Sequence, residues 1–274
     1  GVDNIDLEAA TRRGIVVVNA PDGNTIAAAE HSLALMLALA RNIPRGDASL
    51  KDGRWDRKQL VGVELRQKTL GILGLGRIGS AVARRAQAFD MVCIGYDPYI
   101  SAEQAKHMGV DLVSLQELLE RSDFITIHMP LTDDTHYLLD AEALGSMKPG
   151  VRIINVARGG IVSETALAEA LKAGHVGGAA LDVFEEEPLV ASPLVGCPNV
   201  VLTPHLGAST EEAQLHVAVD VAEAIACLLE GGLPNNAVNM VGIAPDIMEK
   251  LIPYIDLGEK LGAFVAQVGG GIDR

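Results

Sequence analysis

Three groups of residues with complementary acid–base chemistry each stand just after an apolar, strand-like run. They are Arg158, the acidic run Glu185–Glu187, and His205. A histidine takes or gives a proton near neutral pH, and the planar fork of an arginine matches a carboxylate. A carboxylate beside the histidine would favour its protonated form, which helps it act as an acid. This set suits the interconversion of an alcohol and a ketone next to a carboxylate.

Taken singly, each of these residues has a simpler interpretation. A histidine after a strand is more often an ordinary core or surface residue, and a single arginine is usually solvated or salt-bridged. The run Glu185–Glu187 is typical of a solvated acidic turn. The residues themselves do not choose among the three glutamates.

A glycine-rich turn, GLGRIG at residues 74–79, follows the apolar run Thr69–Leu73 and precedes a helical pattern. Gly74 permits a tight turn, Gly76 lets the backbone approach a pyrophosphate, and Gly79 lets the helix pack close to the strand. The free N–H groups at the helix start would face the anion. Such a turn alone is weak evidence, but strand, helix, second strand and acid occur here in the expected order.

The acid that completes this pattern is Asp97, at the end of the run Val92–Tyr96. A carboxylate at this place accepts hydrogen bonds from the adenosine ribose and repels a 2′-phosphate. The following Pro98 and Tyr99 supply no arginine for such a phosphate. The sequence therefore favours NAD over NADP as the cofactor.

Apolar strand-like runs and helical runs alternate after Lys68, which predicts a parallel sheet covered by helices on both faces. Its carboxyl edge would carry the glycine turn, His128-Met129-Pro130 and the catalytic candidates. The expected strands are 69–73, 92–96, 112–113, 124–128, 151–156, 178–183 and 200–203, and the expected helices are 78–89, 102–108, 115–121, 141–147 and 164–173. Outside this series we expect a strand at 14–19, a buried or interfacial helix at 25–41, a polar arm at 43–59, a helix at 210–229, a possible strand at 236–240, and a helical tail with a glycine-rich end.

Composition excludes several classes of protein. The 274 residues carry a net charge of −14, which disfavours nucleic acid and anionic membrane surfaces as partners. The apolar runs are too short to span a membrane. Cys93, Cys197 and Cys227 are too few and too widely spaced for a disulfide framework or a metal site, which favours the cytoplasm.

Four motifs together resemble the D-isomer-specific 2-hydroxyacid dehydrogenases. They are GLGRIG, NVARGGIV, ALDVFEEEP and TPHLGAST, in this order and spacing. The runs GVDNIDLEAATRRGIVVVNAPDGNT, KDGRWDRK and YDPYIS are similar to the branch of that family that acts on 3-phospho-D-glycerate. The resemblance covers residues 1 to about 240.

The resemblance assigns a role to each candidate residue. It makes Arg158 the substrate-binding arginine, Glu187 the acid that orients the histidine, and His205 the acid–base. It also makes Arg57 a contact to the site of a neighbouring subunit, with Trp55 and the helix 25–41 at a dimer interface. Fourteen residues would surround NAD: Gly74, Gly76, Arg77, Ile78, Gly79, Asp97, His128, Met129, Pro130, Val156, Ala157, Asp182, Gly207 and Ala208.

Two positions depart from the family pattern. Met129 stands where relatives often carry threonine, so no side-chain hydrogen bond to NAD is expected there. Ser163 replaces the common aspartate after GGIV, and it can still cap the helix that begins at Glu164.

The fold class that follows is a doubly wound parallel α/β sheet, a Rossmann dinucleotide-binding domain, with remnants of a smaller flavodoxin-like substrate domain. The resemblance implies four parts: residues 1–20, the end of the substrate domain; 21–209, the NAD-binding catalytic domain; 210–240, a return helix and strand; and 241–274, the start of a C-terminal extension. It also implies that most of the substrate domain, which supplies further cationic groups, would precede residue 1.

The implied activity is NAD-dependent oxidation of 3-phospho-D-glycerate to 3-phosphohydroxypyruvate, the first step of L-serine biosynthesis. The implied partners are a small anionic 2-hydroxy acid and a second copy of the chain, as a homodimer or a higher homo-oligomer. A glyoxylate or hydroxypyruvate reductase, or another D-2-hydroxyacid dehydrogenase, is the alternative within the enzyme class. A non-catalytic NAD-sensing module, like the corepressors built on this fold, is the alternative from a different class.

Overall fold

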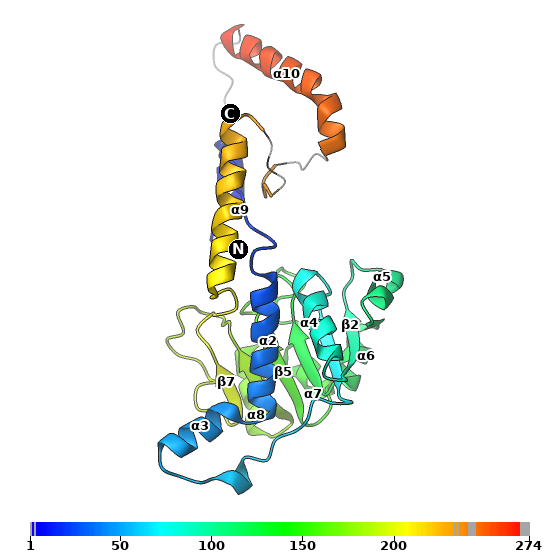
Figure 1. Cartoon of the computed structure of the whole chain (residues 1–274), viewed down its shortest axis with the longest axis vertical. Coiled ribbons are helices and arrows are strands. Elements are labelled where there is room, and N and C mark those ends of the chain that lie inside the picture. The colour runs from blue at the N-terminus through cyan, green and yellow to red at the C-terminus, as the bar shows by residue number, and fades with distance from the viewer. Residues whose placement is uncertain (1, 3, 233, 235, 241–244, 269–274) are drawn as a thin grey trace. The chain divides into compact units, whose positions relative to one another are not determined.

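A computed structural model describes residues 2, 4–232, 234, 236–240 and 245–268. The chain divides into two compact units (Figure 1). The larger unit is Asn24–Gln214, and the smaller combines Gly1–Gly23 with Leu215–Arg274.

The larger unit is built on a seven-stranded parallel sheet with the strand order β3-β2-β1-β4-β5-β6-β7. The order reverses between β1 and β4, which is the switch point where doubly wound folds bind ligands. The strands are β1 (Thr69–Leu73), β2 (Val92–Tyr96), β3 (Asp111–Leu112), β4 (Phe124–Ile127), β5 (Val151–Asn155), β6 (Val176–Leu181) and β7 (Val200–Leu202). All seven expected strands of this series are present, and their bounds differ from the expected ones by at most two residues.

Alternate strand residues point to opposite sides of the sheet. Because both sides carry apolar residues, helices cover both faces. On one face Phe124 and Ile154 join a core with α2, α4 and α5, and on the other Ile125 and Ile153 join a core with α6, α7 and α8. These helices are α2 (Thr25–Ala40), α4 (Arg77–Gln87), α5 (Ala102–His107), α6 (Leu115–Arg121), α7 (Ala141–Ser146) and α8 (Glu164–Lys172). Ser163 caps α8, as expected from the sequence, by accepting a hydrogen bond from the N–H of Ala166.

Helix α2 owes its apolar composition to burial within the chain. Eight of its sixteen residues are buried, among them Met36 and Leu39, and it packs on α4 and β6. Its composition therefore does not by itself indicate a subunit interface. The arm that follows contains α3 (Ile43–Lys51) and a short 3-10 helix, η1 (Arg57–Gln59), and it leaves Trp55 81% exposed.

The smaller unit contains α1 (Leu7–Arg12), most of α9 (Glu211–Leu229), and α10 (Pro245–Val268). The strands expected at 14–19 and 236–240 are wrong. Within the described residues these two segments share a single antiparallel bridge, between Val18 and Ala237. The glycine-rich end expected after α10 lies outside the described residues.

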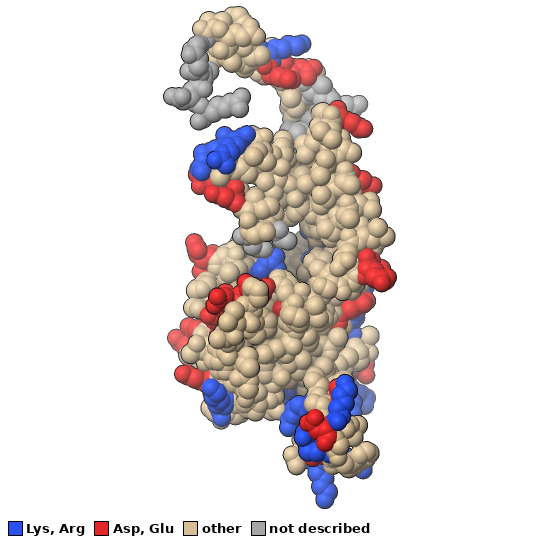
Figure 2. All heavy atoms as spheres, turned by 90° about the vertical axis from the view of Figure 1, so that its left-hand side faces the viewer, with Lys and Arg blue, Asp and Glu red and all other residues tan. Residues whose placement is uncertain are grey.

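Acidic and basic side chains are interspersed on the face drawn in Figure 2, where acidic ones recur along the surface. That face offers no broad basic surface to a polyanion, in line with the net charge of −14. No helix in the described part of the chain is long and apolar enough to cross a membrane.

Candidate active site

The glycine turn lies at the switch point, directly after β1. Gly74 has φ +90°, and a Cβ there would lie 2.7 Å from the carbonyl oxygen of His128. A Cβ at Gly79 would lie 2.0 Å from the carbonyl oxygen of Gly74, so this glycine allows α4 to pack against the turn. A Cβ at Gly76 would meet no atom within 4 Å. The space over Gly76 at the start of α4 therefore fits a phosphate group that approaches the backbone.

Asp97 ties the end of β2 to this turn. Its carboxylate accepts hydrogen bonds from the N–H of Leu75 (2.8 Å) and the N–H of Tyr99 (2.9 Å). A carboxylate has about four acceptor positions, so it retains capacity for two ribose hydroxyls. The geometry is compatible with the predicted role of Asp97.

A cavity of about 430 Å³ opens beside Asp97 and the glycine turn. Six of the predicted cofactor residues line it: Gly74, Gly76, Asp97, His128, Met129 and Pro130. Sequence reasoning missed the rest of its wall, which comes from the end of β2 and from the loop after β4: Tyr96, Pro98, Tyr99, Thr132, Asp134, Thr135 and Leu138. The loop residues carry no spacing signal of their own, and only the position of the loop after β4 could have pointed to them.

A second cavity of about 240 Å³ adjoins the first, because both share His128, Met129 and Pro130. Arg158 and His205 both line the second cavity. Five further predicted cofactor residues lie there, namely Ile78, Val156, Ala157, Gly207 and Ala208, together with Asn24 and Ala28, which the sequence did not single out. The structure thus brings the arginine and the histidine of distant segments to one cavity.

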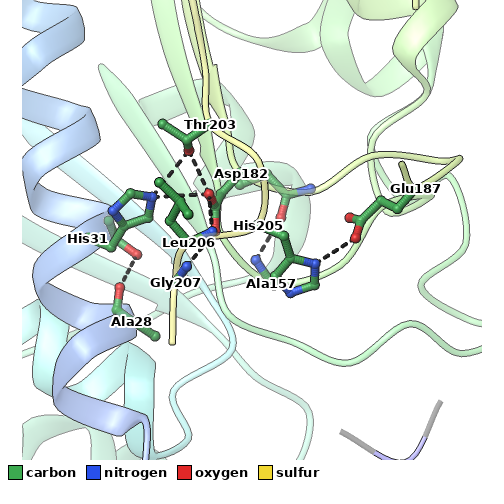
Figure 3. A network of polar contacts seen from close by, with 11 residues as sticks. Ala28, His31, Ala157, Asp182, Glu187, Thr203, His205, Leu206 and Gly207 are labelled. Carbon is green, nitrogen blue, oxygen red and sulfur yellow. Dashed lines mark hydrogen bonds and ion pairs between the residues drawn. The ribbon is translucent and has the colours of Figure 1, made fainter. Parts of the chain in front are cut away.

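The imidazole of His205 is paired with Glu187, and its Nδ1 lies 2.6 Å from a carboxylate oxygen of Glu187 (Figure 3). The other oxygen of Glu187 accepts the N–H of Phe184 at 3.0 Å. Glu185 instead accepts the N–H of Glu164 and the hydroxyl of Tyr137. The geometry thus resolves the choice among the three glutamates that the sequence left open.

Arg158 is held at the end of β5 by hydrogen bonds with Ala157 and Asn155. The amide of Asn155 donates to the carbonyl oxygen of Arg158 at 2.9 Å, and Nη1 of Arg158 donates to the carbonyl oxygen of Ala157 at 2.7 Å. The next residue, Gly159, lies so close to Phe184 that a Cβ there would be 1.7 Å from its carbonyl oxygen. The turns that carry Arg158 and Glu187 are therefore packed directly against each other.

Five predicted site residues do not line either cavity, and one of them is Glu187, which contacts the ring of His205 from outside the lining. Asp182 is fully buried beside the second cavity, where its carboxylate accepts the N–H groups of Leu206 and Gly207 at 2.8 and 2.7 Å. Gly79 lies beneath the turn, and Arg77 at the start of α4 lines neither cavity. Arg57 lies in the arm, so a contact with a neighbouring subunit stays a prediction.

Burial lowers the pKa of His128 to about 3. Its Nε2 lies 2.9 Å from the hydroxyl of Thr126. This imidazole is therefore neutral at physiological pH, and it forms an uncharged wall shared by the two cavities.

A parallel sheet in this order, a glycine turn at its switch point and a histidine–carboxylate pair beside it define the dinucleotide-binding domain of a dehydrogenase. Residues 33–207 match the family model described as "D-isomer specific 2-hydroxyacid dehydrogenase, NAD binding domain". The chain belongs to this family.

Named relatives show which branch of this family the chain is similar to. Over its full length the chain is 58% identical to a D-3-phosphoglycerate dehydrogenase of Synechocystis and 55% identical to one of Methanocaldococcus jannaschii. It spans 50% and 53%, respectively, of the lengths of those relatives. A D-lactate dehydrogenase of Aquifex aeolicus, solved in complex with NAD and lactic acid, is 32% identical with a TM-score of 0.81. That match covers 88% of this chain and 78% of the other.

Proposed function

We propose that this chain carries the NAD-binding and acid–base part of a D-3-phosphoglycerate dehydrogenase. The reaction is oxidation of 3-phospho-D-glycerate to 3-phosphohydroxypyruvate, which begins L-serine biosynthesis. The observation that carries the proposal is the His205–Glu187 pair at 2.6 Å, with His205 and Arg158 lining one cavity next to the glycine turn. The names of the relatives that span the full chain support the substrate.

The described residues fit NAD. Gly76 and the start of α4 would hold the pyrophosphate, and Asp97 would bind the adenosine ribose in the larger cavity. Val156, Ala157, Gly207 and Ala208 would surround the nicotinamide in the smaller one, with Asp182 supporting them from behind. When bound, NAD supplies the acceptor for the hydride.

The protein residues bind the substrate and transfer its proton. Arg158 binds the substrate carboxylate with its guanidinium and orients the carbon that bears the hydroxyl group. Nε2 of His205 takes the hydroxyl proton, because Glu187 holds Nδ1 and so fixes which nitrogen faces the substrate. The carboxylate of Glu187 also stabilises the imidazolium that forms. In the reverse direction, the same imidazolium returns the proton.

Two experiments test the proposal. Isothermal titration of this chain with NAD and NADP should show binding of NAD and much weaker binding of NADP, because Asp97 repels a 2′-phosphate. Turnover of 3-phosphoglycerate and of glycerate should then be compared in the full-length protein. Faster turnover of glycerate would reject the substrate and favour the reductase alternative.

The NAD-sensing alternative is tested by His205→Ala. In an enzyme this variant loses turnover while it retains NAD affinity, because the imidazole is needed only for proton transfer. Full turnover in the variant would contradict the acid–base role. In a sensor the change would leave partner binding intact, and no turnover would be found in the unmodified protein.

We further propose the arrangement of the longer protein. The segments 1–20 and 210–240 would belong to the substrate domain, 21–209 to the catalytic domain and 241–274 to an extension. Two copies would pair through the exposed arm around Trp55, with Arg57 reaching the neighbouring site. The protein would work in the cytoplasm. Sedimentation of the full-length protein and of Trp55→Ala tests the pairing.

A further inference from the structure

The carboxylate of Asp182, just after β6, is the centre of a buried hydrogen-bond network (Figure 3). Its side chain is fully buried, and it accepts four hydrogen bonds. The donors are Oγ1 of Thr203 (2.6 Å), the N–H of Leu206 (2.8 Å), the N–H of Gly207 (2.7 Å) and Nε2 of His31 (3.1 Å). A buried carboxylate with this many donors is fixed in place.

Three of these donors bracket His205 along the chain. Thr203 precedes it by two residues, and Leu206 and Gly207 follow it directly. The N–H of His205 itself donates to the backbone carbonyl oxygen of Asp182 at 2.9 Å. His205 has φ +55°, a left-handed conformation that is uncommon for residues other than glycine. The Asp182 network holds the backbone in this conformation.

His31 is the one donor of the four that comes from outside this strand-end region. It lies on α2, more than 150 residues away in sequence, with 19% of its side chain exposed. Its Nε2 lies 3.1 Å from Asp182 and 3.2 Å from Oγ1 of Thr203. An ionised carboxylate only accepts hydrogen bonds, and the hydroxyl proton of Thr203 is already directed to Asp182. Nε2 of His31 must therefore carry a proton and donate it.

We propose that His31 is a positioning residue for the acid–base loop. By donating to Asp182 and Thr203, it anchors the network to α2 and holds His205, Leu206 and Gly207 in place. The catalytic consequence rests on the proposed function, whereas the structural consequence does not. His31 does not line either cavity, so it acts through Asp182 and not on the substrate.

The simplest test uses the unmodified chain. Nitrogen NMR of the histidine rings should show that Nε2 of His31 carries a proton at neutral pH. A ring that lacks a proton on Nε2 at neutral pH would overturn the inference, and no variant is needed to see it.

Variants test the positioning itself. His31→Phe keeps a ring of similar size without a donor, and His31→Gln places an amide N–H close to the position of Nε2. His107→Phe, on the exposed surface of α5, is the matched control. Amide exchange measured by NMR should accelerate about tenfold or more at Leu206 and Gly207 in His31→Phe, because a hydrogen bond to a charged group is lost. The glutamine variant should restore most of the protection.

The fully buried strand residues Ile125 and Ile153 report on global unfolding in the same spectra. Their exchange should stay as in the unmodified chain, which separates local loosening from general destabilisation. Equal protection of Leu206 and Gly207 in His31→Phe would overturn the inference, and so would equal loosening of all four amides. The control should leave every one of them unchanged.

Kinetics in the full-length protein connect this loosening to catalysis. His31→Phe should lower kcat about tenfold or more, with the KM for NAD within about twofold, and His31→Gln should recover most of the rate. Unchanged turnover with loosened amides would overturn the positioning role. If the unmodified protein turns over no 2-hydroxy acid, the proposed function fails, but the amide result still decides whether His31 holds the loop.

Discussion

Substitution of Gly159 by alanine should disable the site without touching any group that acts on the substrate. Gly159 follows Arg158 and packs against the turn that carries Glu187. The added Cβ would lie 1.7 Å from the carbonyl oxygen of Phe184 and 2.8 Å from the backbone nitrogen of Glu185. Both of these neighbours are backbone atoms, so no flexible side chain can move aside.

The size of the effect follows from this distance. An ordinary carbon–oxygen contact is about 3.3 Å, so the two turns must separate by about 1.6 Å. A displacement of about 1 Å at a catalytic group costs about a hundredfold in rate, and overpacking of this kind costs about 1–3 kcal/mol of stability. We expect kcat for the proposed substrate, 3-phosphoglycerate, to fall about a hundredfold, while NAD affinity changes less, because the glycine turn and Asp97 lie outside the displaced turns.

The assay compares kcat in the full-length protein, the NAD dissociation constant by calorimetry, and urea unfolding of this chain. Gly145→Ala, in α7, is the matched control, because a Cβ there meets no atom within 4 Å. The control should retain turnover and gain up to about 1 kcal/mol of stability. Wild-type turnover in a folded Gly159→Ala variant would refute the argument that close packing of these two turns sets the site.

Three further predictions concern single groups. Glu187→Gln should lower kcat/KM about a hundredfold or more with NAD affinity unchanged, because the imidazolium of His205 loses its charged partner; calorimetry and steady-state kinetics check this, and unchanged kinetics would contradict the pairing. Burial lowers the pKa of His128 to about 3, so the folded state resists its protonation. The free energy of unfolding should therefore fall by about 1.4 kcal/mol per pH unit as the pH drops below about 6.5, relative to a His128→Gln variant; parallel curves for the two proteins would refute this. Burial raises the pKa of the Cys93 thiol from 9.0 to about 11, so the folded state keeps the thiol protonated. Stability should fall as the pH rises from 9 towards 11, and Cys93→Ala should lack that part of the loss in urea titrations at each pH.

The sheet could be predicted from the sequence because its signals are local. Thr69–Leu73 and Val92–Tyr96 are apolar runs that end directly before Gly74 and Asp97, and both were predicted with their true bounds. The run at residues 14–19 has the same composition, yet it forms only the single bridge of Val18. A strand requires a neighbour as well as a suitable composition, and in a single sequence nothing reveals where that neighbour is.

The site was predictable only in part for the same reason. The glycine turn and Asp97 are close in sequence, and spacing alone related them. The partner of His205 was different, since Glu185 and Glu187 are alike in composition and two residues apart. They differ in the groups that their side chains contact. Glu185 accepts hydrogen bonds from the N–H of Glu164 and the hydroxyl of Tyr137, whereas Glu187 contacts His205. The hydrogen bond between His31 and Asp182 joins residues 151 positions apart, so no local sequence pattern indicates it.

The register of β6 and β7 explains how these parts come together. Leu181 pairs with Leu202, which sets Asp182 beside Thr203 where the two strands end. The chain after β6 therefore supplies two carboxylates that position His205, one through the residues around it and one through its ring. The carboxylate of Asp182 accepts the hydroxyl of Thr203 before His205 and the N–H groups of Leu206 and Gly207 after it, whereas Glu187 contacts the ring of His205. A one-residue slip between these strands would turn one set of side chains to the opposite face, separate Asp182 from Thr203 and displace the loop that carries His205. The geometry of the His205–Glu187 pair therefore depends on the pairing of two short strands as much as on the identity of its own residues.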